Sequence, residues 1–139
     1  MPPDQSALQA RAWIKKARSD LRTIELLQVA TDYPYDSVAF HAQQAAEKAL
    51  KAVLTFAQIP FPRWHDLEEL ASLFPRDIAA ELVLDPDSLG FLSQMAIAPR
   101  YPGDDDEIDE GLAHSAAAKA KMIFDRVTEL LRRRGLTGV

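Results

Sequence analysis

The chain has 139 residues, of which 47% are hydrophobic and 27% charged; its net charge is −5 and it contains no cysteine. This length is about that of one globular domain, which excludes an enzyme with separate cofactor and substrate lobes. The missing cysteines exclude disulfides, thiolate nucleophiles and cysteine-ligated metals, and the negative charge disfavours coating of duplex DNA. The N-terminus lacks the features of a signal peptide and no apolar run approaches a membrane span, so we expect a soluble, cytoplasmic protein.

A helical pattern opens the chain. Asp4 or Ser6 can cap a first helix, which should end near Ala30 because Thr31–Pro34 carries turn residues and a proline. Apolar residues follow in steps of four and three at Ala10, Ile14, Ala17, Leu21 and Ile24. Such steps trace one face of a helix, whereas the apolar residues of a strand would alternate.

The second helix is the most regular stretch. Asp36 or Ser37 would cap it, and Ile59–Pro62 should end it. Two neighbouring apolar rows run along it, namely Val38, Ala42, Ala45, Ala49, Ala52 and Phe56, and Ala39, Ala46, Leu50, Val53 and Ala57. Together the rows cover roughly 160°, which is wide for a helix with one neighbour. We therefore expect this helix to pack on two sides, either inside a bundle or at a subunit interface.

Short helices should follow. They are expected from His65–Leu67 to Phe74, over Ile78–Leu84, and from Asp85 or Asp87 to Ala98. Asp66 is a natural N-cap for the first of them, with Glu69 three residues later as in a capping box. A rigid loop, Pro99–Gly103, should come next.

The last helix should begin within the acidic residues 104–110 and end at Arg132–Arg134, before Gly135. Acids at its start and bases at its end both complement the helix dipole. No convincing strand or repeat is present. The sequence therefore predicts an all-α, up-and-down helical bundle of three long helices plus one to three short ones. The first two long helices should form an antiparallel hairpin, with the last helix packed along it.

A polar stripe follows the second helix at His41, Gln44, Lys48 and Lys51, in steps of three, four and three. Two lysines, an amide and an imidazole in line could hold a phosphate and a base, or an acidic partner. The alternative is a solvated edge, in which Glu47 and Lys51 form an ordinary i,i+4 ion pair worth about 0.3–0.5 kcal/mol.

Two further histidines stand near helix starts. His65, beside Arg63, could meet an anion at the N-terminus of the third helix, or could simply order the entry into that helix. His114 in the last helix could face a cleft or be a half-buried helix residue. The presence of serine, histidine and aspartate does not by itself indicate a catalytic triad.

Arg100 and Tyr101 lie between Pro99 and Pro102, which limits the freedom of the backbone. An arginine and an aromatic ring held in this way suit phosphate contact plus stacking, or a structural clamp that closes the bundle end. The acidic residues 104–110 lack the glycine and spaced ligands of a calcium loop. We therefore expect no metal and no cofactor.

Several segments, in this order, resemble those of the HEPN domain family (higher eukaryotes and prokaryotes nucleotide-binding). They are Trp13 with Ala17–Leu21, the block Phe40–Ala52, His65–Leu67 and Arg100–Pro102. The similarity extends over about residues 9–131, which we expect to be the core of a single domain spanning residues 1–139. The resemblance implies a helical bundle that dimerises, and many bacterial members are encoded beside a minimal nucleotidyltransferase in toxin–antitoxin-like pairs.

Many members of this family are also metal-independent ribonucleases with an Arg-x4–6-His motif near the start of the last helix. Here Arg100 precedes His114 by fourteen residues and Arg63 precedes His65 by two, so neither pair fits. We expect a homodimeric binding protein that acts with a nucleotidyltransferase partner and binds a nucleotide. His41, Lys48, Lys51, Arg100 and Tyr101 should line one shared cleft, which would hold the ligand or an acidic partner. The alternatives are an RNA-cleaving enzyme that uses His114 or His65, and a purely structural interaction module.

Overall fold

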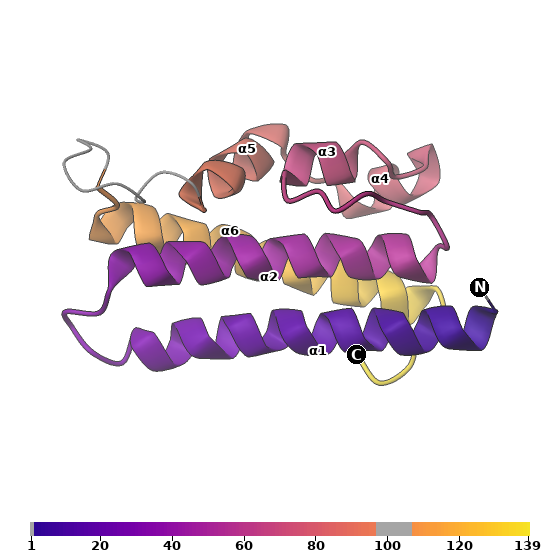
Figure 1. Ribbon diagram of the computed structural model, residues 1–139, viewed down its shortest axis with the longest axis horizontal. Coiled ribbons are helices and arrows are strands. Elements are labelled where there is room, and N and C mark those ends of the chain that lie inside the picture. The colour runs from indigo at the N-terminus through magenta and orange to yellow at the C-terminus, as the bar shows by residue number, and fades with distance from the viewer. Residues whose placement is uncertain (1, 97–106) are drawn as a thin grey trace.

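Three long helices lie alongside one another and three short helices cover one side of them (Figure 1). The computed structural model describes residues 2–96 and 107–139. The elements are α1 (Pro3–Leu27), α2 (Tyr35–Phe56), α3 (Leu67–Ala71), α4 (Arg76–Leu82), α5 (Pro86–Met95) and α6 (Glu110–Arg133). Within these ranges every regular element is a helix, which confirms the predicted all-α bundle.

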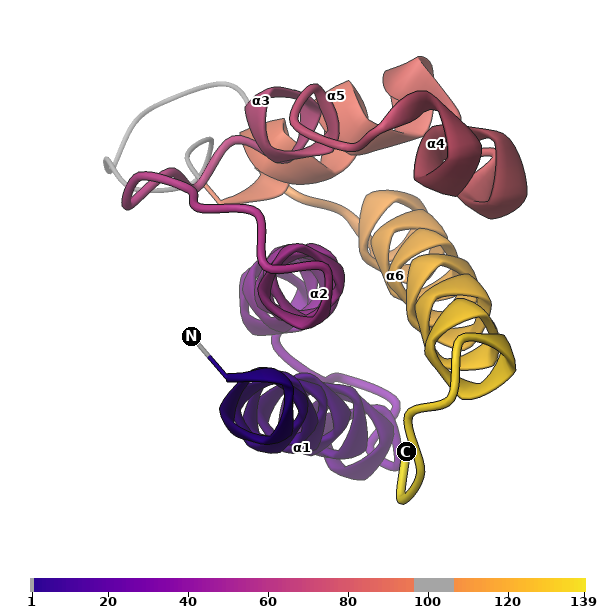
Figure 2. The ribbon, with the colours of Figure 1, turned by 90° about the vertical axis from the view of Figure 1, so that its right-hand side faces the viewer.

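The first two long helices form the predicted antiparallel hairpin, and α6 packs along α2 (Figures 1 and 2). The short helices α3, α4 and α5 carry the chain back between the end of α2 and the start of α6, so α6 runs in the same direction as α2. They form a layer above α2 and α6, on the side away from α1 (Figure 2). No helix in the described part of the chain is long and apolar enough to cross a membrane.

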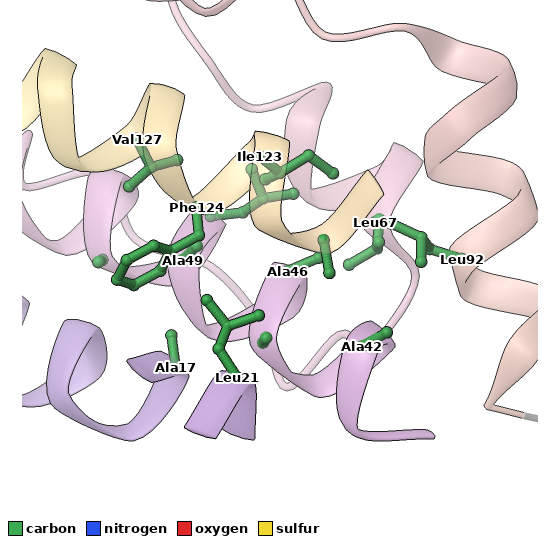
Figure 3. Packing of buried hydrophobic residues seen from close by; sticks show 14 of the residues in the cluster. Ala17, Leu21, Ala42, Ala46, Ala49, Leu67, Leu92, Ile123, Phe124 and Val127 are labelled. Carbon is green, nitrogen blue, oxygen red and sulfur yellow. The ribbon is translucent and has the colours of Figure 1, made fainter. Parts of the chain in front are cut away.

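Helix α2 lies at the centre of the core, as its wide apolar surface predicts. Its alanines face α1 on one side and α6 on the other, and Ala42, Ala46 and Ala49 are fully buried. Figure 3 shows them among Ala17 and Leu21 of α1, and Ile123, Phe124 and Val127 of α6. Small side chains let the helix backbones approach closely. The wide apolar arc is therefore covered within one chain.

The helix ends differ from the predictions at several points. Neither Asp4 nor Ser6 caps α1, and neither Asp36 nor Ser37 caps α2, since both helices begin after a proline without a side-chain cap. In α1, Pro3 is the first helical residue, where the fixed backbone angle of proline suits a helix and its missing N–H costs no hydrogen bond. Helix α1 also ends at Leu27, ahead of the predicted Ala30, because the turn toward Pro34 starts sooner.

The aspartates before the later helices act as caps. Asp66 and Asp109 accept hydrogen bonds from the backbone N–H groups of Glu69 and Leu112, at 3.0 and 2.8 Å. Helix α3 is nevertheless only five residues long and ends at Ala71, short of the predicted Phe74. The loop Pro99–Gly103 lies outside the described residues.

The end of α6 is joined to α4 by ion pairs. The Arg134 guanidinium donates to Asp77 at 3.1 Å and to Glu81 at 2.7 Å. The hydrogen bond from Arg134 holds the pKa of the Asp77 carboxyl below its usual value. These contacts fasten the layer of short helices to the long ones.

Candidate functional site

The polar residues of α2 belong to two groups, and a buried carboxylate lies at the centre of each. One carboxylate is Asp20, which comes from α1, and the other is Glu47 of α2 itself. Buried carboxylates are costly unless they are paired and hydrogen-bonded, so the partners of each one define a connected unit.

The first group consists of Asp20, His41 and Lys48, and Asp20 links it to α1. Its Oδ1 lies 2.8 Å from His41 Nδ1, and its Oδ2 accepts a hydrogen bond of 2.6 Å from Lys48 Nζ. His41 and Lys48 are seven residues apart, which places both side chains on one face of α2. Both side chains are mostly buried. One carboxylate therefore holds an imidazole and an ammonium together between α1 and α2.

Glu47 organises the second group. Its Oε2 accepts from Lys51 Nζ at 3.1 Å, and its Oε1 lies 3.1 Å from His65 Nδ1 and 3.2 Å from Gln43 Nε2. The same Gln43 amide donates to the His65 backbone carbonyl at 3.0 Å. Gln44 in turn donates to Gln43 Oε1 at 2.7 Å. The network fixes the loop before α3 against α2.

Lys51 is not part of a solvated edge. The predicted ion pair with Glu47 is present, but the two side chains are only 8% and 5% exposed. The Lys51 ammonium also lies 5.5 Å from the centre of the Trp13 ring and 5.9 Å from that of Phe61. The expectation of solvation is wrong because these rings, from α1 and from the loop after α2, cover the lysine.

A pocket of about 440 Å³ opens beside the second group. It is lined by Phe40, Gln43, Gln44, His65, Asp66, Ser93 and Ala96. The His65 side chain is 76% exposed although its Nδ1 is held by Glu47, so its Nε2 edge is accessible. The Ser93 hydroxyl oxygen accepts from the Leu67 N–H, which leaves its O–H available as a donor. The pocket thus combines an aromatic ring with hydrogen-bond donors and hydrogen-bond acceptors.

The structure brings together only some of the residues predicted for the site. Gln44 and His65 line the pocket, His41 and Lys48 meet at Asp20, and Lys51 contacts Trp13 and Phe61 instead. A second pocket, of about 470 Å³, lies beside those two rings. Arg100 and Tyr101 lie outside the described residues. His114 is exposed on α6 and does not line the first pocket.

Several residues at the site, among them Phe40, Asp20, Gln43 and Ser93, were not singled out from the sequence as site residues. Asp20 carried a usable signal, because it falls three residues after Ala17 and four before Ile24, which puts it on the buried side of α1. An acid in that position needs a partner from a neighbouring helix. Gln43 carried the same kind of signal, since it falls four residues after Ala39 and three before Ala46, within one of the apolar rows of the second helix.

Among the residues that the structure describes, no group of three or more histidines and acids could hold a metal ion. The acidic residues 104–106, at the start of the acidic run, lie outside them.

Replacing Asp20 by alanine should lower the free energy of unfolding by about 1–2 kcal/mol, because His41 and Lys48 lose their shared acceptor but can still reach water. Urea denaturation measures this loss. Asp36→Ala, which removes an exposed acid from the same hairpin, is the control and should change stability by less than about 0.5 kcal/mol. Equal effects of the two variants would show that Asp20 does not join α1 to α2.

The HEPN domain model matches residues 10–130 of the chain. A protein of Methanocaldococcus jannaschii named "Putative toxin MJ1304" is 46% identical over 54 residues, which are 39% of this chain and 34% of that protein. The match thus covers about a third of the relative's length. No solved structure matches the chain significantly.

Proposed function

This chain belongs to the HEPN domain family, and from that membership we propose that it is the HEPN component of a toxin–antitoxin-type pair. In this proposal it is a homodimer that acts with a nucleotidyltransferase partner and binds a nucleotide in the pocket beside Phe40. The relative from M. jannaschii carries the word toxin in its name, which supports this class of function.

The observation that carries the ligand proposal is the make-up of the pocket. Phe40 offers a partly exposed ring on which a flat base can stack. The volume of about 440 Å³ lies within the range of small-molecule sites. The Gln44 carbonyl, the His65 Nε2 and the Ser93 hydroxyl supply the acceptors and the donor that read the edge of a base.

The geometry favours the base, rather than the phosphates, inside the pocket. The Asp66 carboxylate lines the pocket and would repel a phosphate there. The phosphates would then lie outside the pocket, and Lys48 and Arg100 of the predicted site are the candidate cations for them. Arg100 and Tyr101 follow Ala96 by four and five residues, so they remain part of the proposed site.

Calorimetry with AMP and ATP tests nucleotide binding. Phe40→Ala should weaken binding about tenfold by removing the stacking surface, and Gln44→Ala should weaken it about threefold by removing one hydrogen bond. Gln9→Ala, on the far part of α1, is the matched control and should bind as the unchanged protein does. No binding by the unchanged protein would refute the ligand proposal.

The homodimer is proposed from the family. Light scattering should give about twice the 15.5 kDa of one chain, and a value near 15.5 kDa would contradict it.

The nucleotidyltransferase partner is tested by co-purification with the product of the neighbouring gene.

A ribonuclease is a second candidate, favoured by the contact between Glu47 and His65. A carboxylate on Nδ1 orients the imidazole and leaves Nε2 free to take a proton, as a general base requires. Incubation of the protein with RNA in the presence of EDTA separates the candidates. Cleavage that disappears in His65→Ala or Arg100→Ala would replace the binding proposal, and intact RNA would support it.

A further inference from the structure

One flank of α1, beside α6 and the C-terminal residues, carries a row of cations that the proposed site does not use. Arg11, Lys15, Arg18 and Arg22 recur in steps of four, three and four, and together they span about 60° of the helix. We call these four residues the basic stripe. The acids on the exposed surface of α1 are confined to its ends, at Asp4 and Glu25. Four aligned cations stand out on a chain whose net charge is −5.

Two of the four cations are held in place by the fold. The Arg11 Nε donates a 2.7 Å hydrogen bond to the Thr137 carbonyl, and the Arg18 guanidinium lies 5.4 Å from the centre of the Phe124 ring of α6. Arg22 pairs with Glu25 at 3.0 Å. Side chains that are ordered in advance lose less entropy when they bind a partner. The basic stripe is therefore partly organised for binding.

Large exposed apolar side chains adjoin both ends of the basic stripe. Leu8 precedes Arg11 by three residues and is 64% exposed, whereas Leu26 follows Arg22 by four and is 57% exposed. Val29, just beyond α1, is 83% exposed. These are three of the six exposed large hydrophobic residues among those the structure describes. The surface thus has a charged middle and apolar ends.

From this pattern we propose that the basic stripe docks a protein partner, through an acidic helix whose carboxylates repeat with the same spacing and whose ends are apolar. Carboxylates in steps of four, three and four would face the four cations in register. Leu8, Leu26 and Val29 at the ends offer apolar contact, which the phosphate backbone of a nucleic acid cannot match. They are also aliphatic, whereas single-stranded nucleic acids are bound by aromatic rings on which the bases stack.

A second copy of this chain does not fit the same surface. A two-fold interface places each patch opposite itself, so the basic stripe would face its own cations. The partner is therefore a different, acidic chain. The inference rests on the proposed function only in taking a protein partner to exist, because the basic stripe and the nucleotide pocket have no residue in common.

The experiment uses a helical peptide with four glutamates at this spacing and a leucine beyond each end. Its affinity for the full-length protein is measured by fluorescence anisotropy, beside a scrambled peptide and a single-stranded RNA of about ten nucleotides. Lys15→Glu with Arg22→Glu should weaken peptide binding about tenfold, because two attractions become repulsions. Leu26→Ser should weaken peptide binding while leaving any RNA binding unchanged.

The matched control is Lys16→Glu with Arg76→Glu, which changes the net charge equally at exposed positions away from the basic stripe. It should bind the peptide as the unchanged protein does. Equal losses in both double variants, equal binding of the scrambled peptide, or RNA binding without peptide binding would each overturn the inference. The charge variants should keep their nucleotide affinity. A loss of nucleotide binding that occurs only in the pocket variants would therefore bear on the proposed function and not on the docking proposal.

Discussion

Replacing Glu47 by alanine is expected to lower the free energy of unfolding by about 3–5 kcal/mol, the cost of leaving a buried charge without its partner. Lys51 would lose its only carboxylate among the described residues while Trp13 and Phe61 still cover it. Gln43 and His65 would lose an acceptor as well. The loss is measured by urea denaturation.

The exposed pair Lys121–Asp125 provides a matched control. Its ions lie 2.6 Å apart, closer than the 3.1 Å between Lys51 and Glu47, but both side chains are 57% exposed. Asp125→Ala should cost less than about 0.5 kcal/mol. The double variant Glu47→Leu with Lys51→Met should recover most of the loss, since it removes both buried charges. A Glu47→Ala loss as small as that of Asp125→Ala would contradict the role of burial.

Ala49→Leu should destabilise the protein by about 2–3 kcal/mol through overpacking. Ala49 is fully buried in α2, where α1 and α6 approach from two sides (Figure 3). Three extra carbon atoms there must push one of the two neighbouring helices away. The shift of the urea midpoint measures the effect.

Ala118→Leu is the control for that prediction. Ala118 also lies within a long helix but is exposed on α6, so a larger side chain meets solvent there and stability should change by less than about 0.5 kcal/mol. If Ala49→Leu were as mild, α2 would not be enclosed by helices on both sides.

The helices could be predicted from the sequence because apolar residues at steps of three and four leave little choice of secondary structure. The alanine rows of α2 also indicated packing on two sides, which α1 and α6 provide. The starts of α1 and α2 were misplaced because both helices begin directly after a proline, without a side-chain cap. The direction of α6 relative to α2 depends on α3 to α5, whose packing is not visible in a local pattern.

The site was harder to predict because residues on one helix face can turn to different neighbours. His41, Lys48 and Lys51 share a stripe in the sequence, yet Asp20 attracts the first two and Glu47 the third. Asp20 and Glu47 decide this arrangement. Spacing places Asp20 on the buried side of α1, but it does not say which residues of α2 will pair with it. The pocket also needs Ser93 of α5, which only tertiary packing brings to α2.

An NMR titration of the 15N-labelled protein with AMP tests most directly whether the pocket beside Phe40 binds a nucleotide. We expect saturable shifts that concentrate at Phe40, Gln44 and His65, including the His65 Nε2 signal. Shifts confined to the basic stripe would instead indicate attraction of the phosphate to surface cations. That result, or the absence of any shift at millimolar AMP, would contradict a nucleotide site in this pocket.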